Sequence, residues 1–308
     1  MSRARQYLPG STYTYTRRTC LGTCRLVPVA ATNALVYFAM AVAAVLTGVS
    51  IHAFVAMPNR IRMVVTDNEK RARMPDFLRI FHSLLALALI RRQEEPGPVW
   101  DSRGTDLKRI AGRNTIRDTI VDVLSEPVAA GLCWRPEEWY GAKSLVEDMG
   151  AGPRSRSRPR RFAAEGTSLE RHCDLTLTIP RAFGDISAED YRALLREGLV
   201  ARTAELHERR RRAGGQVLSR RQVQERDIFA RPAEDRWTAP EDAAARPMAR
   251  RLECDEALRA ELVESLRGFR RAYREAYERW RRGDHDVEFP RGTWAVRQYH
   301  GARVPDPA

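Results

Sequence analysis

The segment that decides the fold is Val49-Ser50-Ile51-His52-Ala53-Phe54-Val55-Ala56-Met57-Pro58-Asn59-Arg60-Ile61-Arg62-Met63-Val64-Val65. It holds two runs rich in β-branched and aromatic residues, which favour strands. Pro58 and Asn59 between them are strong turn formers, so the segment predicts a β-hairpin. Residues two apart on a strand point to the same face, and we therefore expect Arg60 and Arg62 to project together.

Similar signals predict the neighbouring elements. Thr12-Tyr13-Thr14-Tyr15-Thr16 alternates like a strand. Met74-Pro75 places a proline in the first turn of a helix. Up to residue 150 the sequence predicts, in order, strand 11–18, helix 30–46, strands 49–57 and 60–66, helix 75–92, a strand near 105–110 and helix 114–126.

These segments resemble, in the same order, the single-tyrosine HUH transposases, and above all the REP-associated tyrosine transposase-like branch. The matching stretches are 7–18, the hairpin 49–65, 74–82, Trp100-Asp101-Ser102, 120–132 and 286–294. The resemblance implies an α+β fold, with a ferredoxin-like antiparallel sheet and helices on one face. It also implies a partner, single-stranded or hairpin DNA, and a possible homodimer.

The residues that carry the family's chemistry are replaced here. In the family, two histidines that open the second hairpin strand hold a divalent metal, and this chain has Arg60 and Arg62 there. The family's nucleophilic tyrosine precedes a helix-end proline by five residues, and that position is Asp122. Glu126 stands where asparagine is usual. Guanidinium has no lone pair for a metal, so we expect no metal, no cofactor and no catalysis.

The replaced residues leave several functions open. Two arginines on one face can hold a phosphate without a metal, or can simply form a solvated strand face. We expect Arg60 and Arg62, together with Arg17 and Arg18 at the end of the first strand, to bind DNA. The alternatives are an active DNA-nicking transposase whose metal site lies elsewhere, and a domesticated protein-interaction module that uses its C-terminal helices.

Composition is consistent with a polyanion partner. Among 308 residues, 53 are basic and 40 acidic, which gives a net charge of +13. Nearly all basic residues are arginine, a bias that a GC-rich genome also produces. An odd number of cysteines, five, and the lack of a signal peptide favour free thiols and a cytoplasmic protein.

One stretch has the length of a membrane span, because residues 32–57 contain no charged side chain. Gly48 and the β-branched residues that follow it divide this run into a helix and a buried strand. We therefore expect no membrane partner.

The chain divides by composition into a transposase-like domain at 1–150, a basic linker at 151–161 and an arginine-rich, mostly helical extension at 162–308. In the extension we expect a strand from His172, a helix from Ser187 and a partly disordered segment at 213–250. A long helix at 253–282 carries one apolar stripe, from Leu258 to Tyr277.

Overall fold

The computed structural model describes residues 5–102, 104–160, 162, 169–232 and 252–305. Its centre is a five-stranded sheet in the order β2-β3-β1-β4-β7. The strands are β1 (Thr12–Arg18), β2 (Ser50–Met57), β3 (Arg60–Thr66), β4 (Asp106–Ala111) and β7 (Leu252–Cys254). The first four pair antiparallel, and β7 pairs parallel with β4. The predicted α+β class and antiparallel sheet are confirmed, whereas β7 was not predicted.

Three helices cover this sheet: α1 (Ala30–Thr47), α2 (Met74–Gln93) and α3 (Arg113–Ala129). On one face, Tyr15 and Phe54 both lie opposite Met63, so these side chains share a side. The Phe54 ring contacts Tyr37 of α1, with 5.7 Å between ring centroids, and the Tyr15 hydroxyl lies 2.5 Å from Nε2 of His82 on α2. This face therefore packs against α1 and α2.

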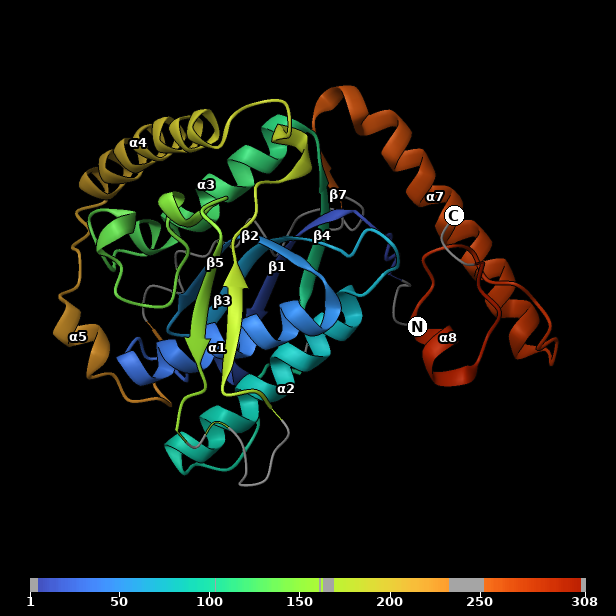
Figure 1. The fold of residues 1–308 in the computed structure, drawn as a ribbon, viewed down its shortest axis with the longest axis horizontal. Helices are drawn as coiled ribbons and strands as arrows, with labels where there is room; N and C mark the ends of the chain where they lie inside the picture. The colour runs from blue at the N-terminus through green and yellow to red at the C-terminus, as the bar shows by residue number, and fades with distance from the viewer. Residues whose placement is uncertain (1–4, 103, 161, 163–168, 233–251, 306–308) are drawn as a thin grey trace.

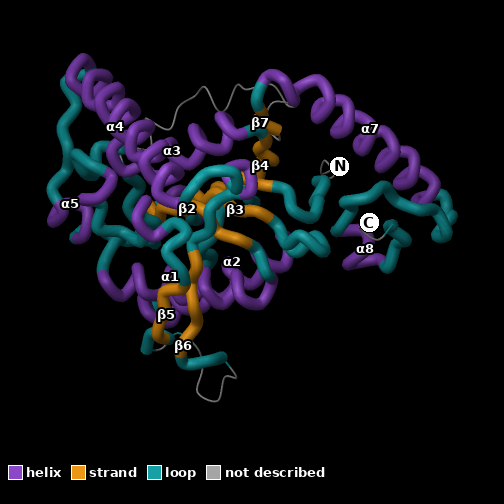
Figure 2. The backbone as a smooth tube through the Cα atoms, turned by 45° about the horizontal axis from the view of Figure 1, so that its top comes forward, coloured by secondary structure: helices purple, strands orange, loops and turns teal. Residues whose placement is uncertain are grey.

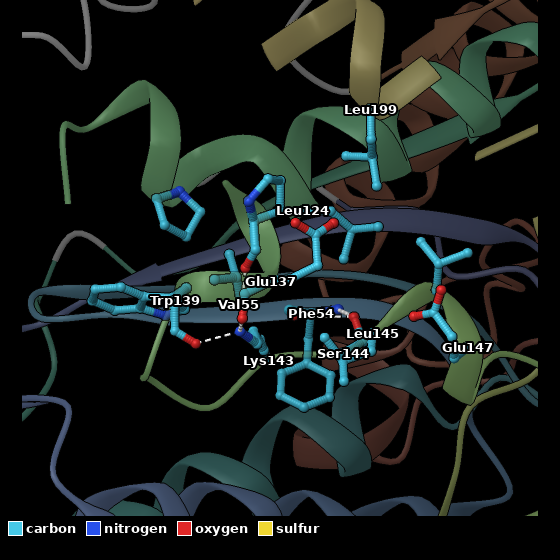
Figure 3. A pocket seen from close by; sticks show the side chains of 13 residues that line it. Phe54, Val55, Leu124, Glu137, Trp139, Lys143, Ser144, Leu145, Glu147 and Leu199 are labelled. Atoms are coloured by element: carbon cyan, nitrogen blue, oxygen red, sulfur yellow. Dashed lines mark hydrogen bonds between the residues drawn. The ribbon is translucent and has the colours of Figure 1, made fainter. Parts of the chain in front are cut away.

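The third helix lies on the opposite face. Thr16 and Val55 are both paired with Arg62, and Arg62 contacts Glu126 of α3. Figure 3 shows the sheet edge-on, with α3 on one side of it and α1 and α2 on the other. The prediction that the helices lie on one face is thus wrong for α3. Both faces of β3 are buried, one by apolar side chains and the other by the ion pairs that Arg60 and Arg62 form with Glu126 of α3.

Helix α1 explains the uncharged run. By length and composition it is a candidate membrane span, and more than half of it is buried within the protein. It packs against α2 and against a second, two-stranded sheet formed by β5 (Pro153–Ser157) and β6 (His172–Thr176) (Figure 2). Gly48 ends α1 in the left-handed region, with φ of 67°, and β2 follows. The predicted division at Gly48 is confirmed.

The segment predicted as a linker is partly a strand. Residues Pro153–Ser157 form β5 and pair in register with β6. Beyond the hairpin, Leu177 bridges to Ile51 at the edge of β2 and to Met149. Phe162 packs edge-on against Phe38 of α1, with 4.8 Å between ring centroids. One hydrophobic core therefore runs from Tyr7 to Val223 without a break at 151–161.

The remaining elements lie outside the sheet. Helix α4 (Ala188–Arg212) packs along the outer side of α3 and is followed by α5 (Arg220–Gln224) (Figure 1). Short 3-10 turns occupy Cys20–Gly22, Pro136–Glu138, Val146–Asp148 and Arg181–Phe183. Part of the predicted disordered segment is thus helical, and its residues 233–250 lie outside the described part of the chain.

The C-terminal part has a core of its own. Helix α7 (Glu256–Arg281) confirms the predicted long helix and extends away from the sheet (Figure 1). Its last turns and α8 (Ala295–His300) surround a small cluster consisting of Ala276, Val287, Phe289, Val296 and Ala302. The buried members of the main core extend to Val223, and the C-terminal cluster begins at Ala276.

Candidate nucleic-acid interface

An ion triad occupies the first strand positions after the hairpin turn. Arg60 and Arg62 point from β3 toward α3, as the strand period predicts, and both bind the carboxylate of Glu126. Arg60 donates from Nε to Oε1 of Glu126, and Arg62 Nη1 lies 3.3 Å from Oε2. Arg60 also donates to the side-chain oxygen of Asn59 at 3.1 Å. The side chains of Arg60, Arg62 and Glu126 are 5%, 27% and 7% exposed.

The charge of Glu126 is set by these two contacts. Burial by itself would raise the pKa of Glu126, but the charges of Arg60 and Arg62 outweigh it, and the pKa lies below its ordinary value. Glu126 is therefore ionised at neutral pH. The triad carries two positive charges and one negative charge, and Arg62 is its most exposed member.

A second ion pair holds Asp122, the residue that the sequence resemblance aligns with a nucleophile. Asp122 lies one helical turn before Glu126 on α3, and its Oδ1 is 3.1 Å from Nε of Arg202 on α4. Burial raises the pKa of Asp122, and the neighbouring Arg202 and Arg62 only partly counter it. Arg202 also pairs with Glu205 at 2.7 Å. Helix α4 therefore supplies the cation that holds Asp122.

The site does not fit a divalent metal. Arginine offers no lone pair, and the Glu126 carboxylate between the two arginines is bound to both of them. Among the described residues there is no group of three or more His, Cys, Asp or Glu side chains that could hold a metal ion.

His52 of β2 offers no free ring nitrogen to a metal. A bulge in β2 sets His52 out of register, and its side chain is buried. Its Nδ1 lies 2.8 Å from the carbonyl oxygen of Thr178, which can only accept, so Nδ1 carries the proton. Nε2 then accepts from the hydroxyl of Thr66 at 2.7 Å. Burial lowers the pKa of His52 to about 4, and the ring is neutral with both nitrogens engaged.

The predicted DNA-binding residues of β1 lie on two different faces. Arg18 is directly opposite Arg60, so it shares the face of the triad. Arg17 is opposite Ile61, on the other face, where its guanidinium lies 5.9 Å from the centre of the Trp100 ring. The structure therefore brings Arg18, Arg60 and Arg62 together and sets Arg17 apart.

The face of the triad continues as a polar strip across β1 and β4. Thr16 lies between Arg62 and Asp106, and Thr14 lies opposite Lys108. We call Thr14, Thr16, Arg18, Arg62, Asp106 and Lys108 the sheet strip. Lys108 was not predicted from the sequence, although its place in a short alternating strand is the signal that would have found it.

The cavity between β2, α3 and α4 is too small for a ligand. It has a volume of about 20 Å³, which is room for about one water molecule. Figure 3 shows Lys143 at this place, where its ammonium group binds three backbone carbonyls, those of Pro136, Glu137 and Trp139. Lys143 is therefore a structural cation.

Comparison with solved structures gives likenesses of fold, among them two transposases. No protein-family model and no curated protein matches the chain. A solved REP-associated tyrosine transposase bound to a REP hairpin is 16% identical, with 48% of this chain and 85% of that chain covered and a TM-score of 0.41. A "putative transposase" from Deinococcus radiodurans R1 is also 16% identical, with 35% and 84% covered and a TM-score of 0.27. Likenesses at these values assign neither a family nor an activity to the chain.

Proposed function

We propose that this chain is a transposase-related DNA-binding protein that holds single-stranded or hairpin DNA without cutting it. The observation that carries the proposal is the ion triad of Arg60, Glu126 and Arg62. The sequence resemblance assigns Arg60 and Arg62 to the positions of the family's metal ligands. Transesterification of DNA needs a metal or another electrophile at the phosphate and a nucleophile beside it. In our assignment, the first place is taken by the ion triad, whose net charge is +1, and the second by Asp122, which is paired with Arg202.

Binding is supported by the basic side chains that share this face of the sheet. Arg62 is 27% exposed and shares its face with Arg18 and Lys108. Arginine and lysine side chains contact phosphate oxygens, and threonine hydroxyls add hydrogen bonds to the backbone of a nucleic acid. Arg60 is too buried to reach a phosphate itself. Arg60 shares the negative charge of Glu126 with Arg62, and the positive charge of Arg62 is therefore not fully neutralised.

The test measures the affinity of the full chain for a labelled hairpin DNA at several salt concentrations. Replacing Arg62 by Gln should weaken binding and reduce the slope of log affinity against log salt by about 0.7, the value of one phosphate contact on a single strand. The control is Arg135→Gln, since Arg135 is 71% exposed, pairs with Glu138 and is not part of the sheet strip. Unchanged affinity and slope in Arg62→Gln would refute a sheet-face interface.

Catalysis is tested in the same samples. With manganese added and the protein then denatured, we expect no covalent protein–DNA band, and a band would establish the nicking alternative. No measurable affinity for hairpin DNA would instead favour the protein-interaction alternative.

A further inference from the structure

A second basic site lies where the C-terminal part meets the main body. An open cavity of about 340 Å³ is found between the start of α2 and the segment that leads into α8. We call it the arginine cavity. The residues that line it include Arg71, Arg73, Asp76, Arg291, Trp294 and Arg297. None of them belongs to the sheet strip.

Two residues that line the arginine cavity, Tyr7 and Gly292, are joined by a close backbone contact. Tyr7 donates its backbone N–H to the carbonyl of Gly292 at 3.0 Å. Gly292 has φ of 90°, and a Cβ added there would lie 2.7 Å from Cγ of Gln6 and 2.9 Å from the carbonyl oxygen of Tyr7. A glycine is therefore required at this position. Since the next residue, Thr293, is buried, the segment that carries Arg291 and Trp294 is fixed against the main body.

The N-terminal end of α2 positions the other side of the arginine cavity. The backbone N–H of Arg73 donates to Oδ1 of the buried Asp67 at 2.7 Å, which anchors the loop before the helix. The side chain of Arg73 pairs with Asp76 at 3.4 Å. Asp76 is the one acidic residue that lines the cavity within the described part of the chain, against four arginines. The lining therefore carries a formal excess of three positive charges.

This combination of residues selects a ligand class. Guanidinium groups bind phosphate through paired N–H donors, and several of them suit the dianionic charge of a phosphate monoester. Trp294 is partly exposed and adds an aromatic ring, on which a nucleobase can stack. The volume falls in the range of small-ligand sites, at its lower end.

We propose that the arginine cavity binds a phosphate monoester attached to a nucleoside. The same chemistry has two sources, a free nucleoside monophosphate or the 5′-phosphorylated end of a single DNA strand. The second source extends the proposed function, whereas the first is independent of it.

The experiment uses calorimetry on the full chain with deoxyadenosine monophosphate, deoxyadenosine and inorganic phosphate. We expect the monophosphate to bind, phosphate to bind more weakly and deoxyadenosine not to bind. The double variant Arg291→Gln/Arg297→Gln should weaken the monophosphate at least tenfold. Arg303→Gln should leave it unchanged, because Arg303 is 69% exposed and pairs with Asp286. Trp294→Leu should weaken the monophosphate but not inorganic phosphate.

Two oligonucleotides distinguish the sources: a single strand with a 5′-phosphate and the same strand with a 5′-hydroxyl. Tighter binding of the phosphorylated strand, lost in the double variant, identifies a DNA end. A monophosphate that binds with no such preference identifies a free nucleotide. Equal affinities of wild type and double variant for all these probes would overturn the proposal. Arg62→Gln separates the two sites, since it should weaken hairpin DNA and leave the monophosphate unaffected.

Discussion

Removing the carboxylate of Glu126 tests how far the ion triad stabilises the fold. In Glu126→Leu, Arg60 would keep its bond to Asn59 but would lose its ion pair with Glu126 at a site where its side chain is 5% exposed. Breaking a buried ion pair from one side costs about 3–5 kcal/mol. Arg62 adds less than about 1 kcal/mol, because it is partly solvated. For a domain of this size the loss corresponds to a drop in Tm of about 6–20 °C.

The assay is urea unfolding of Glu126→Leu, Arg60→Met and the double variant. The double variant removes both members of the most buried pair, so we expect it to recover much of the stability, with a coupling energy of about 2–3 kcal/mol. Glu138→Gln is the matched control, since Glu138 is 39% exposed and its pair with Arg135 contributes about 0–1 kcal/mol. A cost of Glu126→Leu no larger than that of the control, or strictly additive single variants, would refute the reasoning.

The pH dependence gives an independent check on the same residue. The pKa of Glu126 is below its ordinary 4.5 in the folded protein, so its stabilising contribution is present above pH 4.5 and is lost as the pH falls through the folded value. The stability difference between the wild type and Glu126→Gln should therefore be constant from pH 6 to 8 and shrink below pH 4.5. A difference that does not change down to pH 3 would contradict the ionised state of Glu126.

Three further predictions concern the frame around the site. Burial raises the pKa of Asp67 from 3.8 to about 7, so stability should fall as the pH rises between these values, and Asp67→Asn should flatten the dependence of Tm on pH from 5 to 8. Gly48→Ala should lower Tm more than Gly301→Ala: both glycines end helices with φ near 65°, but only at Gly48 would a Cβ meet another atom, 2.4 Å away on Asn68. Because α1 is packed inside the protein, the expressed chain should stay in the supernatant after high-speed centrifugation, and recovery only with detergent would contradict this packing.

Local sequence signals were sufficient for the hairpin and for most of its neighbours. The turn at Pro58 and Asn59, and the break at Gly48, are set by residues that act within a few positions of themselves. The strand period also placed Arg60 and Arg62 on one face. Their partner could not be identified in this way, since Glu126 lies 64 residues beyond Arg62 and reaches it only through the tertiary fold.

The errors arose where pairing is long-range. The arginine-rich stretch around β5 has the composition of a linker, yet its strand is held by β6 and by contacts of its arginines, such as Arg156 over the ring of Tyr37 at 4.3 Å. Strand β7 has three residues and pairs with β4 from more than 100 positions away. Neither has a strong local preference, and tertiary contacts decide both.

The triad also shows how the buried charges at this place depend on one another. Arg60 without Glu126 would lose its buried carboxylate partner, and Glu126 without the arginines would bury an unpaired carboxylate. Either change costs several kcal/mol, a large part of a domain's stability. Unselected drift gives no reason for these charges to match. They do match, and the neighbouring Asp122 has its own cation in Arg202. Compensation of this kind indicates that the folded body was maintained, and a maintained fold is what our proposal of DNA binding without cutting requires.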